Sequence, residues 1–455
     1  MISFALSEIA SIIGAEWIGQ DRIIETVTID SRKITQRCLF VALEGHRFDG
    51  HHFISQAVFN GAYAVLVHRY SKLEVPQLIV EDTRRAFSQL AAWVRRQVSC
   101  KIIAITGSSG KTSVKEMTAS ILSQRGKIVV TQENFNNDIG VSLTLLCLTN
   151  EDDFAVIELG SSSFGEIAWS SSLVFPDIVL VNNIFSSHLS GFGSLVGVAI
   201  AKGEIFSSLP NSGVCVLNAD NNACLLWKHL LLYRKVVYFS LQRRDKVDFF
   251  ASSIVYSWNS ISFILHTPLG SAVVTLLVLG KHSVSNALAA SVLAFFAGAT
   301  LQEIVLGLEK VRPLPGRLFP IVLGIGKLLL DDSYNANVGS MIASIDVLNR
   351  MAGYRVIVVG DMLELGGLHE VQCHRDIGKF IAVTNIHQVF SIGCMSCFIS
   401  YYSGRGEHFY SYNMLISRIV QVFKMHDRVT VLIKGSRSML MDQLVMVLRE
   451  ILYGA

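Results

Sequence analysis

The stretch "IAITGSSGKTSVKE", Ile103 to Glu116, runs from an apolar segment through a glycine- and serine-rich turn into Lys111-Thr112 and an apparent helix. A strand, a flexible turn and a helix in this order are typical of a loop that binds phosphate. The usual spacing of such loops, G-x-x-x-x-G-K-[ST], would place the first glycine at position 105, where this chain has Ile105. The stretch therefore predicts a nucleotide site whose loop departs from the usual spacing.

The segments after this loop alternate between short β-rich runs and amphipathic helical stretches, which predicts an α/β fold. Continuous apolar runs fit strands of a parallel sheet that is buried on both faces. We expect such strands near residues 101–106, 127–131, 154–160, 177–183, 213–220 and 235–240. A second alternating series begins near residue 327, after the proline-rich stretch "RPLPGRLFP" at 312–320, which has the composition of a linker.

The first 80 residues have a different sequence pattern, in which two strand-like segments flank one helix. The chain of 455 residues is too long for one ordinary hydrophobic core, and its length suggests about three domains. We therefore divide it into 1–83, 84–311 and 312–455.

Charge and hydropathy exclude several classes of protein. Lys and Arg exceed Asp and Glu by only three, and no basic cluster is present, so nucleic acid is not an expected partner. No segment reaches the roughly 18 consecutive apolar residues of a membrane span. The N-terminal sequence lacks a basic start and carries Glu8, unlike a secretion signal. The eight cysteines are dispersed, which favours free thiols in a reducing compartment. We expect a cytoplasmic protein without a membrane span.

Phosphate chemistry can be assigned to the loop itself. Gly107 and Gly110 can adopt positive φ angles that turn backbone N–H groups toward phosphate oxygens. Lys111 can reach the β- and γ-phosphates of a nucleotide, and the Thr112 hydroxyl can bind Mg²⁺. These four residues predict ATP binding with a divalent cation.

Three further residues could complete a metal site. Glu158 ends one expected strand and His188 follows another, so both should emerge at the sheet edge where α/β proteins bind ligands. Lys202 lies on an expected helix. Taken singly, each of these residue types is more often structural or solvated than functional. Their role therefore depends on whether the fold brings them together.

A series of motifs, in a fixed order, resembles the Mur ligase family over nearly the whole chain. The resemblance rests on "DSRKITQRCLFVALEGHRFDGHHF", "TGSSGKTSVKEM", "NFNNDIGV", "ELGSSSFGEI", "HLSGFGS", "AKGEIF", "GKHSVSNALAA", "PLPGR", "DDSYNAN", "GDMLELG" and "IKGSRSM". It implies three α/β domains: a small UDP-binding N-terminal domain, a central P-loop-type parallel-sheet ATPase domain and a C-terminal Rossmann-like domain. The shorter loop G-x-x-G-K-T is then expected.

The resemblance also implies the reaction, its cofactors and its site residues. "DSYNAN" with "GDMLELG" is most similar to the members that add D-alanyl-D-alanine to UDP-N-acetylmuramoyl-tripeptide, using ATP and two Mg²⁺ ions. Thr112, Glu158, His188 and Lys202 would hold the metals, Lys202 after carbamoylation by CO₂. Lys111, Lys202, His188 and Arg317 would be catalytic. The nucleotide would contact Thr106, Gly107, Ser108, Ser109, Gly110, Lys111, Thr112, Ser113, Asn134, Asn137, His282, Asn286, Arg317 and Asp332. The uridine end of the nucleotide-linked substrate would contact Ser31, Arg32, Arg47, Asp49, Gly50 and His51, and further substrate contacts would come from Tyr334, Asn335 and Asn337.

Two departures from the family pattern affect local geometry. Val338 stands where a proline usually follows "YNAN", and Gln36-Arg37-Cys38 replaces a Pro-Gly turn. Three alternative functions would require other sequence features. The ligase that adds the third amino acid would carry a "DNPR"-type motif, which is absent. A P-loop kinase or ATPase would show the full Walker spacing and an Asp-ended strand in place of Glu158. A regulatory nucleotide-binding module would not need Lys111, Glu158, His188 and Lys202 together. By family similarity we expect a monomer.

Overall fold

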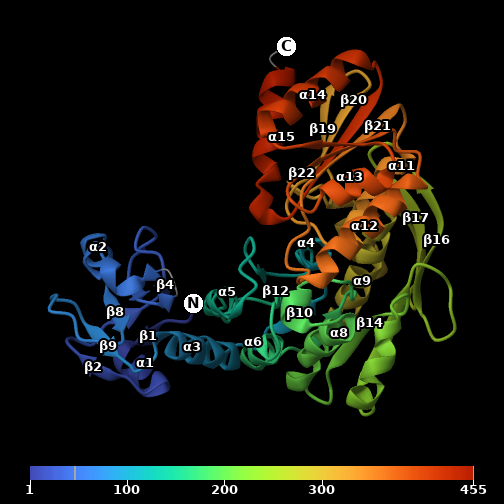
Figure 1. Cartoon of the computed structure of the whole chain (residues 1–455). Helices are drawn as coiled ribbons and strands as arrows, with labels where there is room; N and C mark the ends of the chain where they lie inside the picture. Colours follow the sequence, from blue (N-terminus) through green and yellow to red (C-terminus); the bar gives the residue numbers. More distant parts are fainter. Residues whose placement is uncertain (46–47, 454–455) are drawn as a thin grey trace.

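Three large sheets, built from consecutive parts of the chain, organise the molecule (Figure 1). The computed structural model describes residues 1–45 and 48–453. The N-terminal unit holds a five-stranded sheet in the order β2-β9-β8-β5-β4. Its elements are β1 (Phe4–Ala5), α1 (Leu6–Ile13), β2 (Glu16–Ile18), β3 (Ile23–Ile24), β4 (Thr26–Thr28), β5 (Cys38–Val41), β6 (Glu44–Gly45), β7 (Phe48–Asp49), α2 (Ile54–Phe59), β8 (Ala64–Val67) and β9 (Gln77–Ile79).

The central unit is built on a nine-stranded sheet in the order β11-β12-β10-β13-β14-β15-β16-β17-β18. Its strands are β10 (Lys101–Thr106), β11 (Ile128–Val130), β12 (Phe154–Glu158), β13 (Ile178–Val181), β14 (Val214–Asn218), β15 (Lys235–Ser240), β16 (Phe249–Tyr256), β17 (Ile261–Thr267) and β18 (Gly270–Leu276). The pairs from β11 to β16 are parallel, whereas β16, β17 and β18 run antiparallel. This antiparallel extension was not predicted.

Helices cover both faces of the parallel part, which explains the continuous apolar strands. The helices are α4 (Lys111–Leu122), α5 (Asp138–Leu146), α6 (Glu166–Val174), α7 (Leu189–Phe192), α8 (Leu195–Gly203), α9 (Lys281–Ala297) and α10 (Leu301–Lys310). Alternate residues of β10 enter two different cores: Ile102 and Ala104 pack with α5 and α6, and Ile103 and Ile105 with α4 and α9. Burial on both faces is therefore what selects apolar residues at every position.

The C-terminal unit is a six-stranded sheet in the order β19-β20-β24-β21-β22-β23. All its pairs are parallel except β19 with β20. Its elements are β19 (Phe319–Gly324), β20 (Lys327–Asp332), α11 (Val338–Arg350), β21 (Tyr354–Val359), α12 (Leu368–Ala382), β22 (Gln388–Ile392), α13 (Cys397–Ser403), β23 (Gly406–Phe409), α14 (Tyr412–Met425), β24 (Val429–Lys434) and α15 (Met441–Tyr453). Residues from α11 and α12 fill one core of this sheet, and residues from α14 and α15 fill another.

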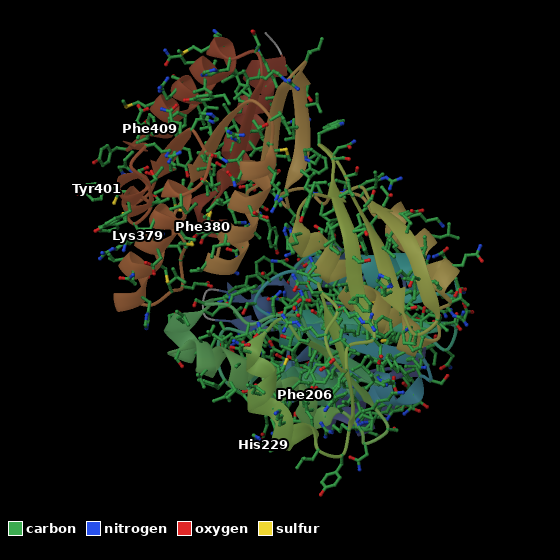
Figure 2. All side chains as sticks on the ribbon, turned by 90° about the vertical axis from the view of Figure 1, so that its right-hand side faces the viewer. Phe206, His229, Lys379, Phe380, Tyr401 and Phe409 are labelled. Atoms are coloured by element: carbon green, nitrogen blue, oxygen red, sulfur yellow. The ribbon has the colours of Figure 1, made fainter. Side chains whose placement is uncertain are left out.

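The arrangement of the units places the N-terminal one at a distance from the C-terminal one (Figure 1). Helix α3 (Thr83–Gln97) packs against α1, α5 and α6, so one continuous core joins the N-terminal and central units. The three sheets lie within the segments 1–83, 84–311 and 312–455, and the first boundary falls at the start of α3. In the view of Figure 2, Phe206 lies inside the central unit, whereas the exposed Tyr401 projects from the C-terminal one.

The two departures from the family pattern are accommodated by local geometry. Val338 is the first residue of α11, a position where proline is favoured but not required, and Asn337 caps the helix by accepting from the Ser340 N–H group. Arg37 takes a φ of +50°, the conformation that a glycine would adopt more easily, and its guanidinium contacts Glu25.

Among the described residues, no helix has both the length and the apolarity needed to cross a bilayer.

Arg95 is a buried residue of α3, the helix that connects the N-terminal and central units, and it binds the end of α6. Its Nε donates to the Val174 carbonyl (2.8 Å) and its Nη2 to the Phe175 carbonyl (3.0 Å), which satisfies the C-terminal end of α6. We expect Arg95→Ala to lower the free energy of unfolding by about 3 kcal/mol, because buried carbonyl groups lose charged donors. Urea denaturation of the full chain measures this. The exposed neighbour Arg96→Ala should change it by less than about 0.5 kcal/mol.

Candidate nucleotide and ligase site

The phosphate-binding loop is formed by four residues between β10 and α4. Ile105 is fully buried inside β10 and pairs with Glu158 of β12, so no loop residue exists at the position of the usual first glycine. Gly107 and Gly110 have φ angles of +147° and +78°. A Cβ on Gly110 would lie 2.7 Å from the side chains of Asn182 and Asn286. Both the conformation and the space therefore require glycine at position 110.

Two asparagines after β13 hold the loop in place. The Ser109 N–H group donates to Asn183 Oδ1 (2.9 Å), and the Nδ2 groups of Asn182 and Asn183 both donate to the Ser109 carbonyl (3.0 Å). Helix α4 begins directly after Gly110, at Lys111, so its positive dipole end faces the loop. The loop is thus preorganised as an anion site.

Lys111 and Arg317 bring two cationic groups to the start of α4. The Lys111 Nζ donates to the Gly107 carbonyl (2.9 Å). Burial lowers the pKa of the Lys111 ammonium, Glu158 opposes this shift and Arg317 adds to it. Arg317 comes from the linker before β19, and its Nη2 donates to Thr112 Oγ1 (2.8 Å). Both charges are therefore directed at the place where a nucleotide's terminal phosphates would lie.

Thr112 and Glu158 form an oxygen-rich pair that fits a hard divalent cation. The Thr112 hydroxyl donates to Glu158 Oε2 (2.7 Å), and Asn136 Nδ2 donates to Oε1 (2.8 Å), which fixes the buried carboxylate. Hydroxyl and carboxylate oxygens are the ligands that Mg²⁺ prefers. Within residues 1–45 and 48–453, no cluster of three His, Cys, Asp or Glu side chains is suited to a metal. A cation here would thus depend on nucleotide and water oxygens as well.

Lys202 and His188 both lie close to the ring of Phe192. The Lys202 Nζ is 5.5 Å from the ring centroid and donates to Ser161 Oγ (2.8 Å). Burial, assisted by the charge of Lys111, lowers the pKa of Lys202 to about 7. His188 precedes α7 with a φ of +51°, and its ring centroid lies 6.4 Å from that of Phe192. An ammonium cannot bind a metal, so only a modified Lys202 would fit a second cation.

A cavity of about 1020 Å³ between the central and C-terminal units brings the predicted residues together. It is lined by Gly107, Ser108, Ser109, Gly110, Lys111, Thr112, Ser113, Asn134, Asn137, Glu158, His188, Lys202, His282, Asn286, Arg317, Asp332, Tyr334, Asn335 and Asn337. Thr106 is different, because its buried hydroxyl donates to the Leu159 carbonyl (2.9 Å) and so ties β10 to the end of β12. Burial lowers the pKa of His282, which favours a neutral imidazole on the cavity wall.

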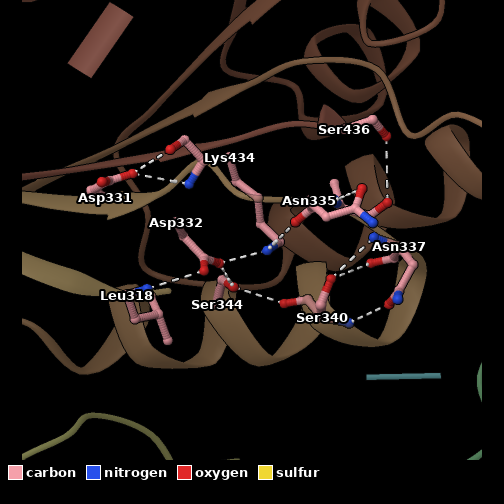
Figure 3. A network of polar contacts seen from close by, with 11 residues as sticks. Leu318, Asp331, Asp332, Asn335, Asn337, Ser340, Ser344, Lys434 and Ser436 are labelled. Atoms are coloured by element: carbon pink, nitrogen blue, oxygen red, sulfur yellow. Dashed lines mark hydrogen bonds and ion pairs between the residues drawn. The ribbon is translucent and has the colours of Figure 1, made fainter. Parts of the chain in front are cut away.

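Three predicted residues of the C-terminal unit, Asp332, Asn335 and Asn337, belong to a connected polar network (Figure 3). Asp332 accepts from Lys434 Nζ (2.6 Å), Ser344 Oγ (2.5 Å) and the Leu318 N–H group (3.1 Å). The Asp332 carboxylate therefore accepts hydrogen bonds from three groups of the C-terminal part of the chain. Asn337 reaches across to the central unit, where its Nδ2 donates to the Ser108 carbonyl (3.3 Å).

Tyr334 lies close to two guanidinium groups of the C-terminal part of the chain. Its ring lies 4.4 Å from Arg317 and 5.9 Å from Arg437, measured to the ring centroid. Asn335 uses its carbonyl to accept from Lys434 Nζ (2.9 Å). Tyr334 is thus held by cation–π contacts that also hold Arg317 over the loop.

The residues predicted at the uridine end lie in the N-terminal unit, outside this cavity. Ser31 is buried and donates to Gln56 (3.3 Å), whereas Arg32 is exposed and paired with Asp30. His51 accepts the His68 N–H at Nε2 and contacts Asp49 at Nδ1 (2.7 Å). A Cβ on Gly50 would lie 2.8 Å from the backbone of Leu43. Arg47 lies outside the described residues.

Several residues at the site were not predicted: Asn136, Asn182, Asn183, Glu364 and Arg437. For Asn182 and Asn183 a signal was available, since they follow the apolar strand "DIVLV" just as Glu158 ends its own strand. Asn136 lies in "NFNNDIGV" between the predicted residues Asn134 and Asn137. Glu364 and Arg437 lie in the quoted motifs "GDMLELG" and "IKGSRSM", but these motifs do not indicate which residues of the central unit they meet.

A short phosphate-binding loop at the edge of a parallel sheet, closed by a second Rossmann-like unit, defines an α/β nucleotide-binding enzyme. Comparison with family models finds the Mur ligase middle domain at residues 105–294 and the Mur ligase family, catalytic domain, at residues 23–98. The chain belongs to the Mur ligase family. The predicted fold class, three α/β parts with a parallel central sheet and a Rossmann-like C-terminal part, is confirmed.

Within this family, the chain is similar to ligases that are named for the addition of D-alanyl-D-alanine. The UDP-N-acetylmuramoyl-tripeptide–D-alanyl-D-alanine ligase of Escherichia coli is 52% identical over 99% of both chains. A crystal structure of MurF from Acinetobacter baumannii is 34% identical, with a TM-score of 0.93 over 98% of this chain and 99% of that one. The MurF ligase from Thermotoga maritima in complex with ADP has the same fold, with a TM-score of 0.82 at 24% identity over 94% and 98%.

Proposed function

We propose that the chain joins D-alanyl-D-alanine to UDP-N-acetylmuramoyl-tripeptide in an ATP-dependent reaction and so makes the pentapeptide precursor of peptidoglycan. The observation that carries this proposal is the 52% identity, over 99% of both chains, to the Escherichia coli enzyme named for that reaction. The cavity that gathers the phosphate-binding loop, Lys202 and Arg317 supports it.

The reaction needs an activated carboxylate. The terminal carboxylate of the tripeptide attacks the γ-phosphorus of ATP, ADP leaves, and an acyl phosphate remains. The amine of D-alanyl-D-alanine then attacks the acyl carbon, and phosphate departs from the tetrahedral intermediate. Two anions must approach each other in the first step, so Lys111 and Arg317 act by neutralising charge at the γ-phosphate. Mg²⁺ bound by Thr112 and Glu158 would supply further positive charge there.

A carbamate on Lys202 belongs to the same proposal. The neutral Nζ attacks CO₂, an N–C bond forms and one proton is lost, which leaves a carboxylate on a long stem. The lowered pKa of Lys202, about 7, makes the neutral amine available, and the Ser161 hydroxyl beside Nζ can hold the product. With His188, this carboxylate would hold a second Mg²⁺, which would supply charge stabilisation at the acyl phosphate.

The parts of the chain divide the substrates among them in this proposal. Residues 1–83 bind the UDP end through Ser31, Arg32, Arg47, Asp49, Gly50 and His51. Residues 84–311 bind ATP, with His282, Asn286, Asn134 and Asn137 around the nucleoside and loop, and residues 312–455 seat the dipeptide near Tyr334, Asn335 and Asn337. The enzyme would act as a cytoplasmic monomer, which size-exclusion chromatography with light scattering tests.

Phosphate release tests the function directly. We expect the purified chain with ATP and Mg²⁺ to release phosphate only when UDP-N-acetylmuramoyl-tripeptide and D-alanyl-D-alanine are both present. Tripeptides ending in diaminopimelate and in lysine are compared, because the sequence does not choose between them. Turnover that does not depend on the dipeptide would instead indicate a kinase or ATPase. Turnover with UDP-N-acetylmuramoyl-dipeptide and a free amino acid would indicate the preceding ligase.

A further inference from the structure

A contact between two loops joins the central unit to the C-terminal unit beside the proposed metal site. The His188 Nδ1 lies 2.6 Å from Glu364 Oε2. Two residues further on, the N–H group and the hydroxyl of Ser190 both donate to the Glu364 carbonyl, each at 3.3 Å. Gly366 is equally close, since a Cβ there would lie 3.2 Å from the Ser190 backbone. The segments 188–190 and 364–366 therefore fit each other at both backbone and side chain.

Both partners of the ion pair have an unusual backbone conformation. His188 has a φ of +51° and Glu364 a φ of +65°. Residues other than glycine, asparagine and aspartate seldom adopt this region, because their Cβ approaches the backbone. Such conformations persist where the surrounding structure holds them, and they are concentrated at functional sites. Here the two outliers face each other across the boundary between units.

The C-terminal unit presents Glu364 from a rigid loop. The preceding Met362 N–H group donates to Nε2 of the fully buried His374 (2.9 Å), and the Leu363 N–H group donates to Ser436 Oγ (2.8 Å). The backbone that leads into Glu364 is thus fixed by the core of its own unit.

We propose that Glu364 is a positioning residue that orients the His188 imidazole for the second metal ion and completes that site only when the C-terminal unit contacts the central unit. A hydrogen bond from Nδ1–H to Glu364 Oε2, which lies 2.6 Å away, would hold the histidine in one tautomer and leave Nε2 as the nitrogen that binds a cation. Metal-binding histidines are commonly oriented in this way by a carboxylate on the other ring nitrogen. The inference rests on the proposed function, because that function supplies the second cation.

The simpler reading is an ion pair that only stabilises the interface. The His188 side chain is 32% exposed and that of Glu364 is 60% exposed, and pairs this open contribute little to stability. Yet His188 packs against the same Phe192 ring as the proposed metal ligand Lys202. The two readings differ in whether the effect of Glu364 passes through His188.

Manganese binding measures that effect without catalysis. The full-length protein with saturating ADP is titrated with Mn²⁺, and free Mn²⁺ is followed by electron paramagnetic resonance. We expect Glu364→Ala to weaken the weaker of two Mn²⁺ sites about tenfold, while Glu364→Gln, whose amide oxygen can still accept from Nδ1–H, stays within about threefold of the unmodified protein. The exposed Glu450→Gln on α15 is the matched control for loss of charge and should leave both sites unchanged.

A double-mutant cycle decides between the readings. In the His188→Ala background, Glu364→Ala should cause no further loss of Mn²⁺ affinity, because the imidazole that Glu364 orients is absent. The same tenfold loss in that background would overturn the inference. So would unchanged Mn²⁺ affinity in Glu364→Ala, or a Glu364→Gln variant as weak as the alanine variant. The titration uses no peptide substrate, so failure of dipeptide-dependent phosphate release would refute the proposed function separately.

Discussion

Lys111→Met is expected to lower dipeptide-dependent phosphate release about a thousandfold, because the loop loses the cation nearest the γ-phosphate. The Lys111 Nζ is anchored on the Gly107 carbonyl at 2.9 Å, so it is held in place before the nucleotide binds. Among the side chains of the site, Arg317 is then the cation left to oppose, together with bound Mg²⁺, the charge that builds up when the carboxylate attacks. Steady-state phosphate release at saturating tripeptide, dipeptide, ATP and Mg²⁺ measures the loss.

The control for this prediction is Lys127→Met, which removes an exposed lysine of the same unit that is paired with Glu151. It should leave the rate within about twofold, as expected for a surface change away from the cavity. The thermal unfolding midpoint of both variants reports whether the fold is intact. A Lys111→Met variant that is folded and retains a tenth or more of the activity would contradict the role given to Lys111.

The sequence predicts the site best where function follows from local order along the chain. A buried strand, a four-residue turn and a helix are adjacent in sequence, so the position of the loop was readable from residues 101–116. Glu158 could be placed at the same edge because parallel strands end together, and β10 does pair with β12 in the register Ile105 to Glu158. The missing glycine follows from this register, since Ile105 belongs to the strand.

The sequence predicts less well where a contact depends on two units meeting. Thr106 belongs to the loop motif, yet its hydroxyl faces Leu159 and serves the sheet. Asp332 follows the family motif, but only the fold shows its carboxylate occupied by Lys434, Ser344 and the Leu318 N–H group. Glu364 lies 176 residues beyond His188 in the chain and has no periodic or spacing signal that links the two. Such pairs are set by the tertiary arrangement alone.

Lys202→Ala is expected to lower dipeptide-dependent phosphate release at least about a hundredfold, since it removes the stem that would carry a metal-binding carboxylate. Lys202 is 1% exposed, and its ammonium lies near the charge of Lys111 without a carboxylate partner within ion-pair distance among the described residues. A permanent cation would be costly at such a place. Conversion to a carbamate replaces that unfavourable charge with one of the opposite sign.

Chemical rescue separates this role from simple packing. Formate or acetate should partly restore turnover in Lys202→Ala, because a small carboxylate can enter the space left by the side chain. The same salts should not stimulate the unmodified enzyme or the exposed-site control Lys228→Ala. Bicarbonate should restore activity to CO₂-depleted unmodified enzyme and have no effect on Lys202→Ala, which lacks the amine that CO₂ modifies. Full activity of Lys202→Ala without any added carboxylate would show that the residue has no part in metal binding.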